Sequence, residues 1–420
     1  METHRMKTKL LFTVLGLTGI LLWQCSEPNY PDNIYDPNEQ GLPDPVITSV
    51  SPADSAFSGI GIITITGQHF SSDPEKNLVY FNGNRGSLQS ATETELVVQA
   101  PNLVADSVKI QVAVIGAYNF AEFDHYKLYP PVVEWGNFDH FFALYAMAMD
   151  SLENLYVSHS DDRDILRVFP NGERDPNPYG THSFLKADAM RMGPAGELYI
   201  ARRYKSIYKV PAGGGAASSW KNLPGNVKAY DLDFDQYGNL YTGGRKNELY
   251  RINVLNGESS FATVATYPTD VHVNAIRVFD GYVYIIGDYI GTDTTVIQDG
   301  IWRNEIQDAT TLGPTELVID WGSAMGGSDA PILNGITFAE DGTMILACDN
   351  VAALYSIDPP YTGQPITPIY TEVLDPPATK ITWGNGNYLY VNSRSSDDTK
   401  KRIFRVDMVK QGAPYYGRSL

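Results

Sequence analysis

Ala146-Met147-Ala148-Met149-Asp150-Ser151-Leu152-Glu153-Asn154-Leu155-Tyr156-Val157 reads as two short strands joined by a turn. The chain repeats this pattern five more times, and the second strand of each copy contains a large apolar anchor. The anchors are Tyr156, Tyr199, Tyr241, Tyr284, Ile345 and Tyr390, which are 43, 42, 43, 61 and 45 residues apart. A period of about 40 to 45 residues with several short strands per unit predicts the blades of a β-propeller.

Each copy ends with a third strand in which two apolar residues are followed, in most copies, by a basic one. These strands are Ile165-Leu166-Arg167, Ile207-Tyr208-Lys209, Leu249-Tyr250-Arg251, Ile301-Trp302-Arg303, Leu354-Tyr355-Ser356 and Ile403-Phe404-Arg405. One additional strand, residues 132–135, precedes the first copy, whereas the last copy ends at its third strand. Residues 129–420 are therefore predicted to form a six-bladed propeller, closed by pairing of residues 132–135 with 403–406 so that no sheet edge stays open.

Residues 45–128 have a different pattern, with short strands in which apolar and polar residues alternate. This pattern predicts an immunoglobulin-like sandwich, so the expected fold class is all-β throughout. The segment resembles an IPT/TIG domain, and the phrases that carry the resemblance are Ser51-Pro52, Thr64-Ile65-Thr66-Gly67, Phe81-Asn82-Gly83 and Ala100-Pro101. The resemblance implies a spacer or interaction module.

The N-terminal 25 residues have the features of a secretory signal. Basic residues in Met6-Lys7-Thr8-Lys9 precede an apolar run over residues 10–23. The run ends in Leu21-Leu22-Trp23-Gln24-Cys25, which resembles a bacterial lipobox and implies lipidation of Cys25, with residues 26–44 as a flexible tether. The expected location is the outer membrane, facing the cell exterior as in surface lipoproteins of Bacteroidetes. The alternative location is the periplasmic face of the membrane. The alternative to a lipobox is an ordinary signal peptide.

The charge balance excludes one class of partner. The chain has 31 Lys and Arg residues against 49 Asp and Glu residues, a net charge of -18. Such a surface repels phosphate backbones and anionic lipid, so we expect no nucleic-acid partner and membrane contact only through the lipid anchor.

The candidate ligand site lies where the loops entering the innermost strands meet the loops after the second strands, because both emerge on one face of a propeller. The entering positions are Tyr145, Asp188, Tyr230, Asn274, Asn334 and Thr379, and the exits include His159, Arg202, Arg203, Arg245, Asp288, Asp349 and Arg394. Long loops at 288–300 and 308–333 add Tyr289 and Trp321, the aromatic residues expected first in ligand contact. The predicted ligand-binding residues are Arg202, Arg245, Tyr289, Trp321, Asn334, Asp349 and Arg394. The alternative is that these polar groups pair with one another around a wet channel.

The repeats also resemble NHL-type and gluconolactonase-like six-bladed propellers. The phrase from Leu333-Asn334-Gly335-Ile336 to Ala347-Cys348-Asp349 carries this resemblance. It implies a metal site, for calcium or another divalent cation, at Asn334 and Asn274. Tyr145 and Thr379 stand where the family places acidic ligands, so the oxygen set is incomplete and the leading expectation is no cofactor.

No catalytic signature is present, since the chain lacks Gly-x-Ser-x-Gly and His-Glu-x-x-His spacings. We therefore expect no catalytic residues. The expected function is that of a non-catalytic surface protein that binds a polysaccharide or oligosaccharide, and the expected protein partner is an outer-membrane transporter complex. This expectation comes from the resemblance to glycan-binding lipoproteins that join TIG-type spacers to a terminal β domain. The alternatives are a gluconolactonase-like or lyase-type enzyme and a protein-interaction scaffold.

Overall fold

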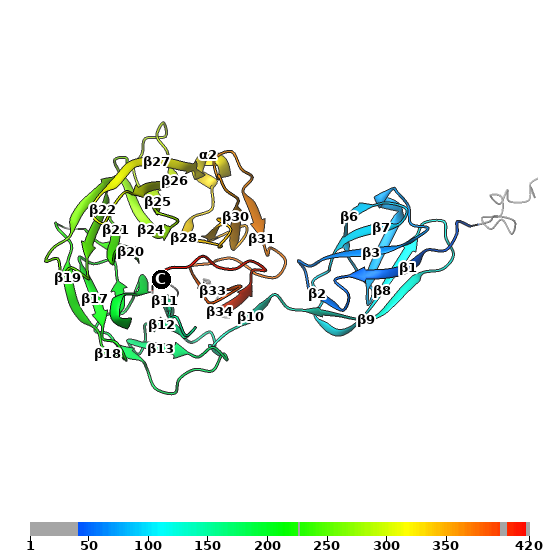
Figure 1. The fold of residues 1–420 in the computed structure, drawn as a ribbon, viewed down its shortest axis with the longest axis horizontal. Helices are drawn as coiled ribbons and strands as arrows, with labels where there is room; N and C mark the ends of the chain where they lie inside the picture. Colours follow the sequence, from blue (N-terminus) through cyan, green and yellow to red (C-terminus); the bar gives the residue numbers. More distant parts are fainter. Residues whose placement is uncertain (1–40, 226, 395–400, 417–420) are drawn as a thin grey trace, which may run out of the picture.

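The computed structural model describes residues 41–225, 227–394 and 401–416, and it is all-β, with a sandwich followed by a propeller (Figure 1). The predicted signal segment, Cys25 and most of the tether lie outside the described residues. Within the described ranges, the few helical turns are η1 (Pro74–Lys76), η2 (Pro194–Gly196), α2 (Trp321–Met325) and η3 (Gly327–Asp329). None of the described helices is both long and apolar enough to cross a bilayer.

The N-terminal domain consists of two packed sheets. One has the order β1 (Val46–Ser51), β3 (Ile62–Gln68), β7 (Glu95–Gln99), β6 (Ser87–Ala91), and the other β2 (Ser55–Phe57), β9 (Ala121–Tyr129), β8 (Ala105–Val114), β4 (Asn77–Phe81), β5 (Asn84–Arg85). Alternate residues of each strand point inward, so Ile63 and Ile65 of β3 and Val108 and Ile110 of β8 have no exposed surface. The alternation in the sequence thus gives the core of an immunoglobulin-like sandwich.

Six further sheets form the blades of the propeller, each described here from its innermost strand outward. Blade 1 consists of β11 (Leu144–Met149), β12 (Leu155–His159), β13 (Asp164–Val168) and β14 (Gly180–Thr181), with β18 (Gly215–Ala216) added at the edge, and blade 2 of β15 (Ala189–Met192), β16 (Leu198–Ala201), β17 (Ser206–Val210) and β19 (Ser218–Asn222). Blade 3 consists of β20 (Ala229–Phe234), β21 (Asn239–Gly244), β22 (Lys246–Asn253) and β23 (Ala262–Thr266), and blade 4 of β24 (Val271–Phe279), β25 (Tyr282–Tyr289), β26 (Asp299–Ile306) and β27 (Leu312–Asp320). Blade 5 consists of β28 (Leu333–Phe338), β29 (Met344–Cys348), β30 (Leu354–Ile357) and β31 (Thr367–Ile369), and blade 6 of β32 (Lys380–Trp383), β33 (Tyr388–Ser393), β34 (Arg402–Asp407) and β10 (Val132–Glu134). The predicted number of blades is confirmed.

The ring closes as the strand count predicts. β10 pairs antiparallel with β34, with Val132 opposite Val406 and Glu134 opposite Phe404. The backbone N–H of Trp135 extends the ladder by donating to the carbonyl of Ile403 at 2.8 Å. The sheet of the last blade is therefore completed by the first strand of the domain.

The innermost strands contact those of the neighbouring blades all round the ring. Because both faces of each are covered, they are buried almost throughout instead of alternating, as in β11 and β20. This places the first residues of six strands around one central axis.

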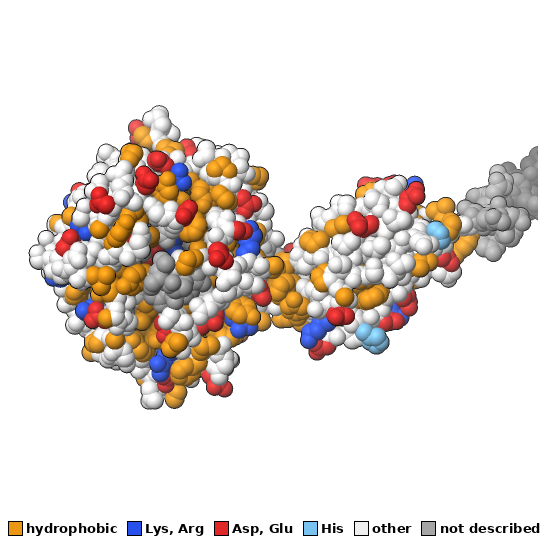
Figure 2. All heavy atoms as spheres, in the orientation of Figure 1, with side chains coloured by type: hydrophobic (Ala, Val, Ile, Leu, Met, Phe, Trp, Pro, Cys, Tyr) orange, Lys and Arg blue, Asp and Glu red, His pale blue; other side chains and the backbone are white. Residues whose placement is uncertain are grey.

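The sandwich and the propeller meet beside blade 6. The side-chain amide of Asn102 donates to the carbonyl of Glu372 at 2.7 Å, and a hollow of about 440 Å³ beside it is lined by Pro130, Pro131 and Pro376, among other residues. Figure 2 shows hydrophobic side chains gathered along this junction.

Candidate functional site

A pocket of about 140 Å³ lies where the innermost strands begin. Its lining residues are Tyr145, Ala187, Asp188, Arg203, Asn274, Asn334, Thr379, Lys380 and Arg394, and we call it the mouth pocket. Five of the six entering positions identified from the sequence are in this set. Larger hollows lie at the domain junction and between turns of neighbouring blades. Among the hollows described, the mouth pocket is the one to which five blades contribute.

Amide side chains at the mouth are held by backbone carbonyls of the next blade. The Nδ2 of Asn274 donates to Leu333 O at 2.8 Å, and that of Asn334 to Ala378 O at 3.1 Å. Asn392 makes the equivalent bond to Tyr145 O at 2.7 Å, from blade 6 to blade 1. These bonds fix the two amides that line the pocket, and each amide oxygen remains a hydrogen-bond acceptor.

Among the described residues, three cationic side chains line the mouth pocket, against one carboxylate. Arg203 Nε donates to Asp188 Oδ1 at 2.9 Å, and its guanidinium lies 4.3 Å from the centre of the Tyr230 ring. The guanidinium of Arg394 lies 4.2 Å from the centre of the Tyr145 ring. The pocket is therefore polar and positively charged.

Lys380 is the third cation, and its ammonium makes no hydrogen bond or ion pair with another described residue. Burial lowers the pKa of Lys380, and the carboxylates of Asp231 and Asp188 oppose this shift. These two residues belong to blades 3 and 2, whereas Lys380 begins β32 of blade 6. The ammonium of Lys380 is therefore within electrostatic range of carboxylates from two other blades.

A layer of buried charge lies deeper along the axis. Asp233 is 1% exposed, with Arg191 Nε and Arg277 Nη1 each 3.5 Å from its carboxylate oxygens. Its Oδ2 also accepts from Val278 N at 2.8 Å, which joins blade 3 to blade 4. We call Arg191, Asp233 and Arg277 the charged layer.

The opposite end of the axis is covered by residues 408–416, which we call the closing tail. Its backbone bonds to blades 5 and 6, through Ala413 N to Phe338 O at 3.0 Å and Gly412 N to Gly386 O at 3.0 Å. The Tyr415 ring is buried under the guanidinium of Arg277, 4.3 Å from it. Figure 1 shows the described part of the closing tail running toward the centre of the ring.

Of the predicted ligand-binding residues, Asn334 and Arg394 line the mouth pocket, as does Asn274 from the alternative metal site. The other five lie elsewhere. Arg202 packs its guanidinium 4.7–5.1 Å from the rings of Phe184, Tyr204 and Tyr208. Arg245 is exposed near His272, whose pKa is lowered by burial and by the charges of Arg245 and Arg203.

The aromatic residues of the two long loops, Tyr289 and Trp321, both lie outside the lining of the mouth pocket. Trp321 has no exposed surface, and its indole N–H donates to Pro331 O at 2.7 Å, so the expectation of a stacking platform there is corrected. Tyr289 is half-buried, lies outside the pocket lining, and accepts from Asp293 N at 3.1 Å. Asp349 accepts from Ile332 N at 2.8 Å and is thus part of the loop structure.

The residues that the sequence prediction missed are Lys380 and Arg203. Arg203 is one of the predicted loop exits, but the predicted set of ligand-binding residues contains its neighbour Arg202 instead. Lys380 directly follows the entering position Thr379. The sequence signal that could have identified Lys380 is a cationic residue at the first position of an innermost strand.

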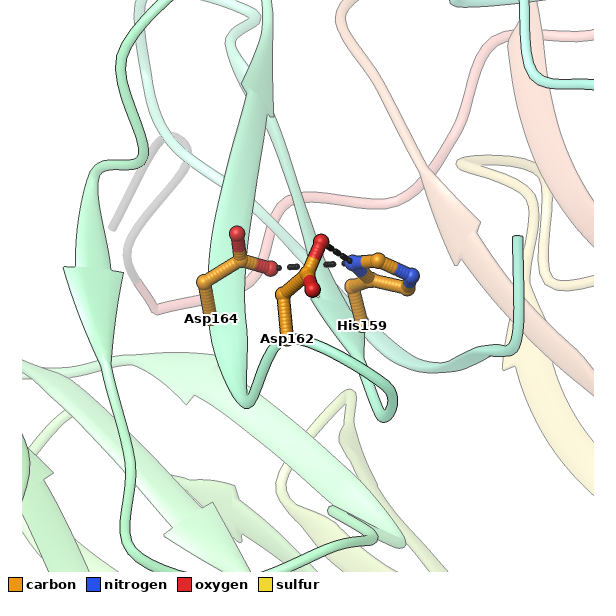
Figure 3. A group of neighbouring side chains, drawn as sticks. All are labelled: His159, Asp162 and Asp164. Carbon is orange, nitrogen blue, oxygen red and sulfur yellow. Dashed lines mark hydrogen bonds and ion pairs between the residues drawn. The ribbon is translucent and has the colours of Figure 1, made fainter.

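Among the described residues, one cluster of His and Asp side chains could hold a metal, and the mouth pocket is the metal site that the gluconolactonase resemblance implies. At the turn between β12 and β13, His159 Nδ1 lies 3.2 Å from Asp164 Oδ1 and 3.6 Å from Asp162 Oδ2 (Figure 3). At the mouth pocket, Asn274 and Asn334 offer amide oxygens beside three cationic groups, and the one carboxylate of the lining is bonded to Arg203. That lining does not fit a divalent cation, which prefers several carboxylate ligands.

Comparison with known proteins gives the class of fold. Residues 45–127 match the IPT/TIG domain family. A protein of Bacteroides thetaiotaomicron described as a candidate phosphatase is 12% identical, covering 90% of this chain and 99% of that one with a TM-score of 0.50. A luciferin-regenerating enzyme is 15% identical, covering 69% and 99%, with a TM-score of 0.50. An auxiliary nutrient binding protein of Bacteroides ovatus is 13% identical, covering 89% and 99%, with a TM-score of 0.49.

No curated protein matches the chain. At these identities the likenesses concern the fold alone. The protein is an all-β protein in which an IPT/TIG sandwich precedes a six-bladed propeller.

Proposed function

We propose that the protein is a lipid-anchored, non-catalytic binding protein of the cell envelope whose mouth pocket binds a saccharide. The observation that carries this proposal is the convergence of side chains from five blades on one pocket. Amide, hydroxyl and guanidinium groups there match the many hydroxyls of a sugar, and pockets of this kind fix a ligand through a few placed polar groups. The IPT/TIG domain then acts as a spacer between the membrane and the binding site.

The lining also argues for binding over catalysis. Within the described residues of the mouth pocket, the single carboxylate Asp188 is bonded to Arg203, so no free carboxylate stands ready as a general base. Recognition by a non-catalytic site needs only the donors and acceptors that are present. Cooperation with an outer-membrane transporter in polysaccharide uptake belongs to the same proposal.

Saccharide binding is tested on the mature chain from residue 26 with a glycan array, followed by calorimetry on the glycans that bind. Tyr145→Ala is expected to weaken binding by about 1–2 kcal/mol, because the ring at the mouth is truncated. Tyr237→Ala is the matched control, since Tyr237 is an exposed tyrosine at the turn between β20 and β21. If no glycan binds, or if both variants weaken binding equally, the proposal is wrong.

Lipid anchoring is tested at Cys25, which lies outside the described residues. Cys25→Ala is expected to move the protein from the membrane fraction to the soluble fraction, because the acylated residue is lost. Fractionation and labelling with a radioactive fatty acid give the readouts. A wild-type protein that takes up no label, with a variant that stays in the membrane fraction, would contradict the anchor.

A further inference from the structure

The charge of the mouth pocket is opposite to that of the whole chain. The chain has a net charge of -18, yet the pocket lining has three cations and one carboxylate. The charged layer below has two arginines, which face Asp233 and the nearby Asp231, so the deeper residues leave the excess unchanged. The pocket is therefore a local site of positive charge in an acidic protein.

Basic side chains continue from the pocket over the adjoining loops of blades 2 and 3. Lys205, Arg245 and Lys246 are exposed there, and the backbone of Arg245 bonds to that of Lys228. Asp288 is the acidic neighbour of Arg203 on this side, and burial raises the pKa of its carboxyl. A positive field of this kind attracts and orients an anionic ligand.

Lys380 has the least satisfied charge of the set. Its side chain is half-buried and lines the mouth pocket, and its ammonium has no hydrogen-bond partner among the described residues. A desolvated ammonium without a partner is costly, and an anion in the pocket removes that cost. Asp188 does not supply this anion to Lys380, because the Asp188 carboxylate is bonded to Arg203.

We propose that the mouth pocket binds the oxyanion of an acidic saccharide, a carboxylate or a sulfate, through Lys380, Arg203 and Arg394. This inference rests on the proposed function and names its ligand class. The pocket is small, at about 140 Å³, so it takes one charged substituent and not a whole chain of sugars. The rest of the ligand then lies on the rim, against Tyr145 and the two amides.

The test uses pairs of glycans that differ only in charge. Each uronate oligosaccharide is compared with its methyl ester, and each sulfated galacto-oligosaccharide with its desulfated form, on the mature chain. The acidic member of a pair is expected to bind more tightly, with an affinity that falls as salt is raised. A preference within the uronate pairs identifies the anion as a carboxylate, and a preference within the sulfated pairs identifies it as a sulfate.

Lys380→Met is expected to weaken binding of the acidic member by about 10- to 100-fold, the effect of losing one hydrogen bond from a charged group, and to weaken binding of the neutral member much less, so that the preference for the acidic member is lost. Lys380→Arg keeps the charge and is expected to retain the preference. Lys221→Met on the outer strand β19 is the matched control. Thermal melting of each variant confirms folding.

Equal binding of charged and neutral partners, or a preference that survives Lys380→Met, overturns the inference and leaves saccharide binding intact. Absence of binding to every glycan, charged or neutral, overturns both proposals. The two failures are therefore distinguished by the same set of measurements.

Discussion

Trp135→Ala is expected to lower the free energy of unfolding by about 3–5 kcal/mol, the range for truncating a large buried aromatic residue. Trp135 is 8% exposed, directly follows the closing strand β10, and packs against Tyr390 with ring centres 6.0 Å apart. The guanidinium of Arg405 covers it at 4.0 Å. The change therefore removes contacts between the first and last segments of the ring, and urea unfolding followed by tryptophan fluorescence and circular dichroism measures the loss.

Phe141→Ala is the control for Trp135→Ala. Phe141 lies six residues further along the chain and is 75% exposed, so its truncation is expected to change stability by less than about 0.5 kcal/mol. A loss below about 1 kcal/mol for Trp135→Ala would show that closure of the ring does not depend on this segment.

Asp233→Asn is expected to cost about 3–5 kcal/mol, because it removes the carboxylate that pairs with the buried guanidinium groups of Arg191 and Arg277 and leaves Asp231 to balance both. The substitution keeps the shape of the side chain, so the loss reports charge. The free energy of unfolding, measured by denaturant titration, gives the result.

The control for Asp233→Asn is Asp341→Asn, which removes the ion pair with Lys410 at 2.8 Å. Both side chains of that pair are about half exposed, so the expected cost is below about 1 kcal/mol. Equal costs for the two variants would show that the charged layer is not desolvated in solution.

The architecture could be predicted because burial in a propeller is periodic. Each Tyr or Ile anchor packs between blades, so the repeat in the sequence records the repeat in space. The closing strand could be predicted from one extra strand at the start and one missing at the end, and the register of β10 against β34 confirms it. The sandwich could be predicted from strict alternation of apolar and polar residues.

The site could be predicted only in part, because the sequence does not give side-chain direction in a turn. Arg202 and Arg203 lie in the turn between β16 and β17, and Arg203 has a positive φ of 48°. The Arg202 side chain packs against Phe184, Tyr204 and Tyr208, whereas that of Arg203 lines the mouth pocket. Trp321 was misassigned because a long loop can bury its own aromatic residue. Its ring packs edge-on against Tyr355, 5.6 Å between centres, as part of a core cluster.

The charged layer and the closing tail could not be predicted, since both depend on contacts between distant blades. Asp233 lies on an innermost strand and gives no sign in the sequence that it faces two arginines. Tyr415 lies in what the sequence shows only as a short end after the last strand.

Among the described residues, the closing tail covers one end of the ring axis, which leaves the mouth pocket as the open end. A polymer cannot be threaded through the ring from one face to the other, so a long glycan can only insert an end or a side group, or lie across the opening. A bound molecule must also leave by the route through which it arrived. Any partner seated over the basic loops of blades 2 and 3 would therefore control arrival and departure together.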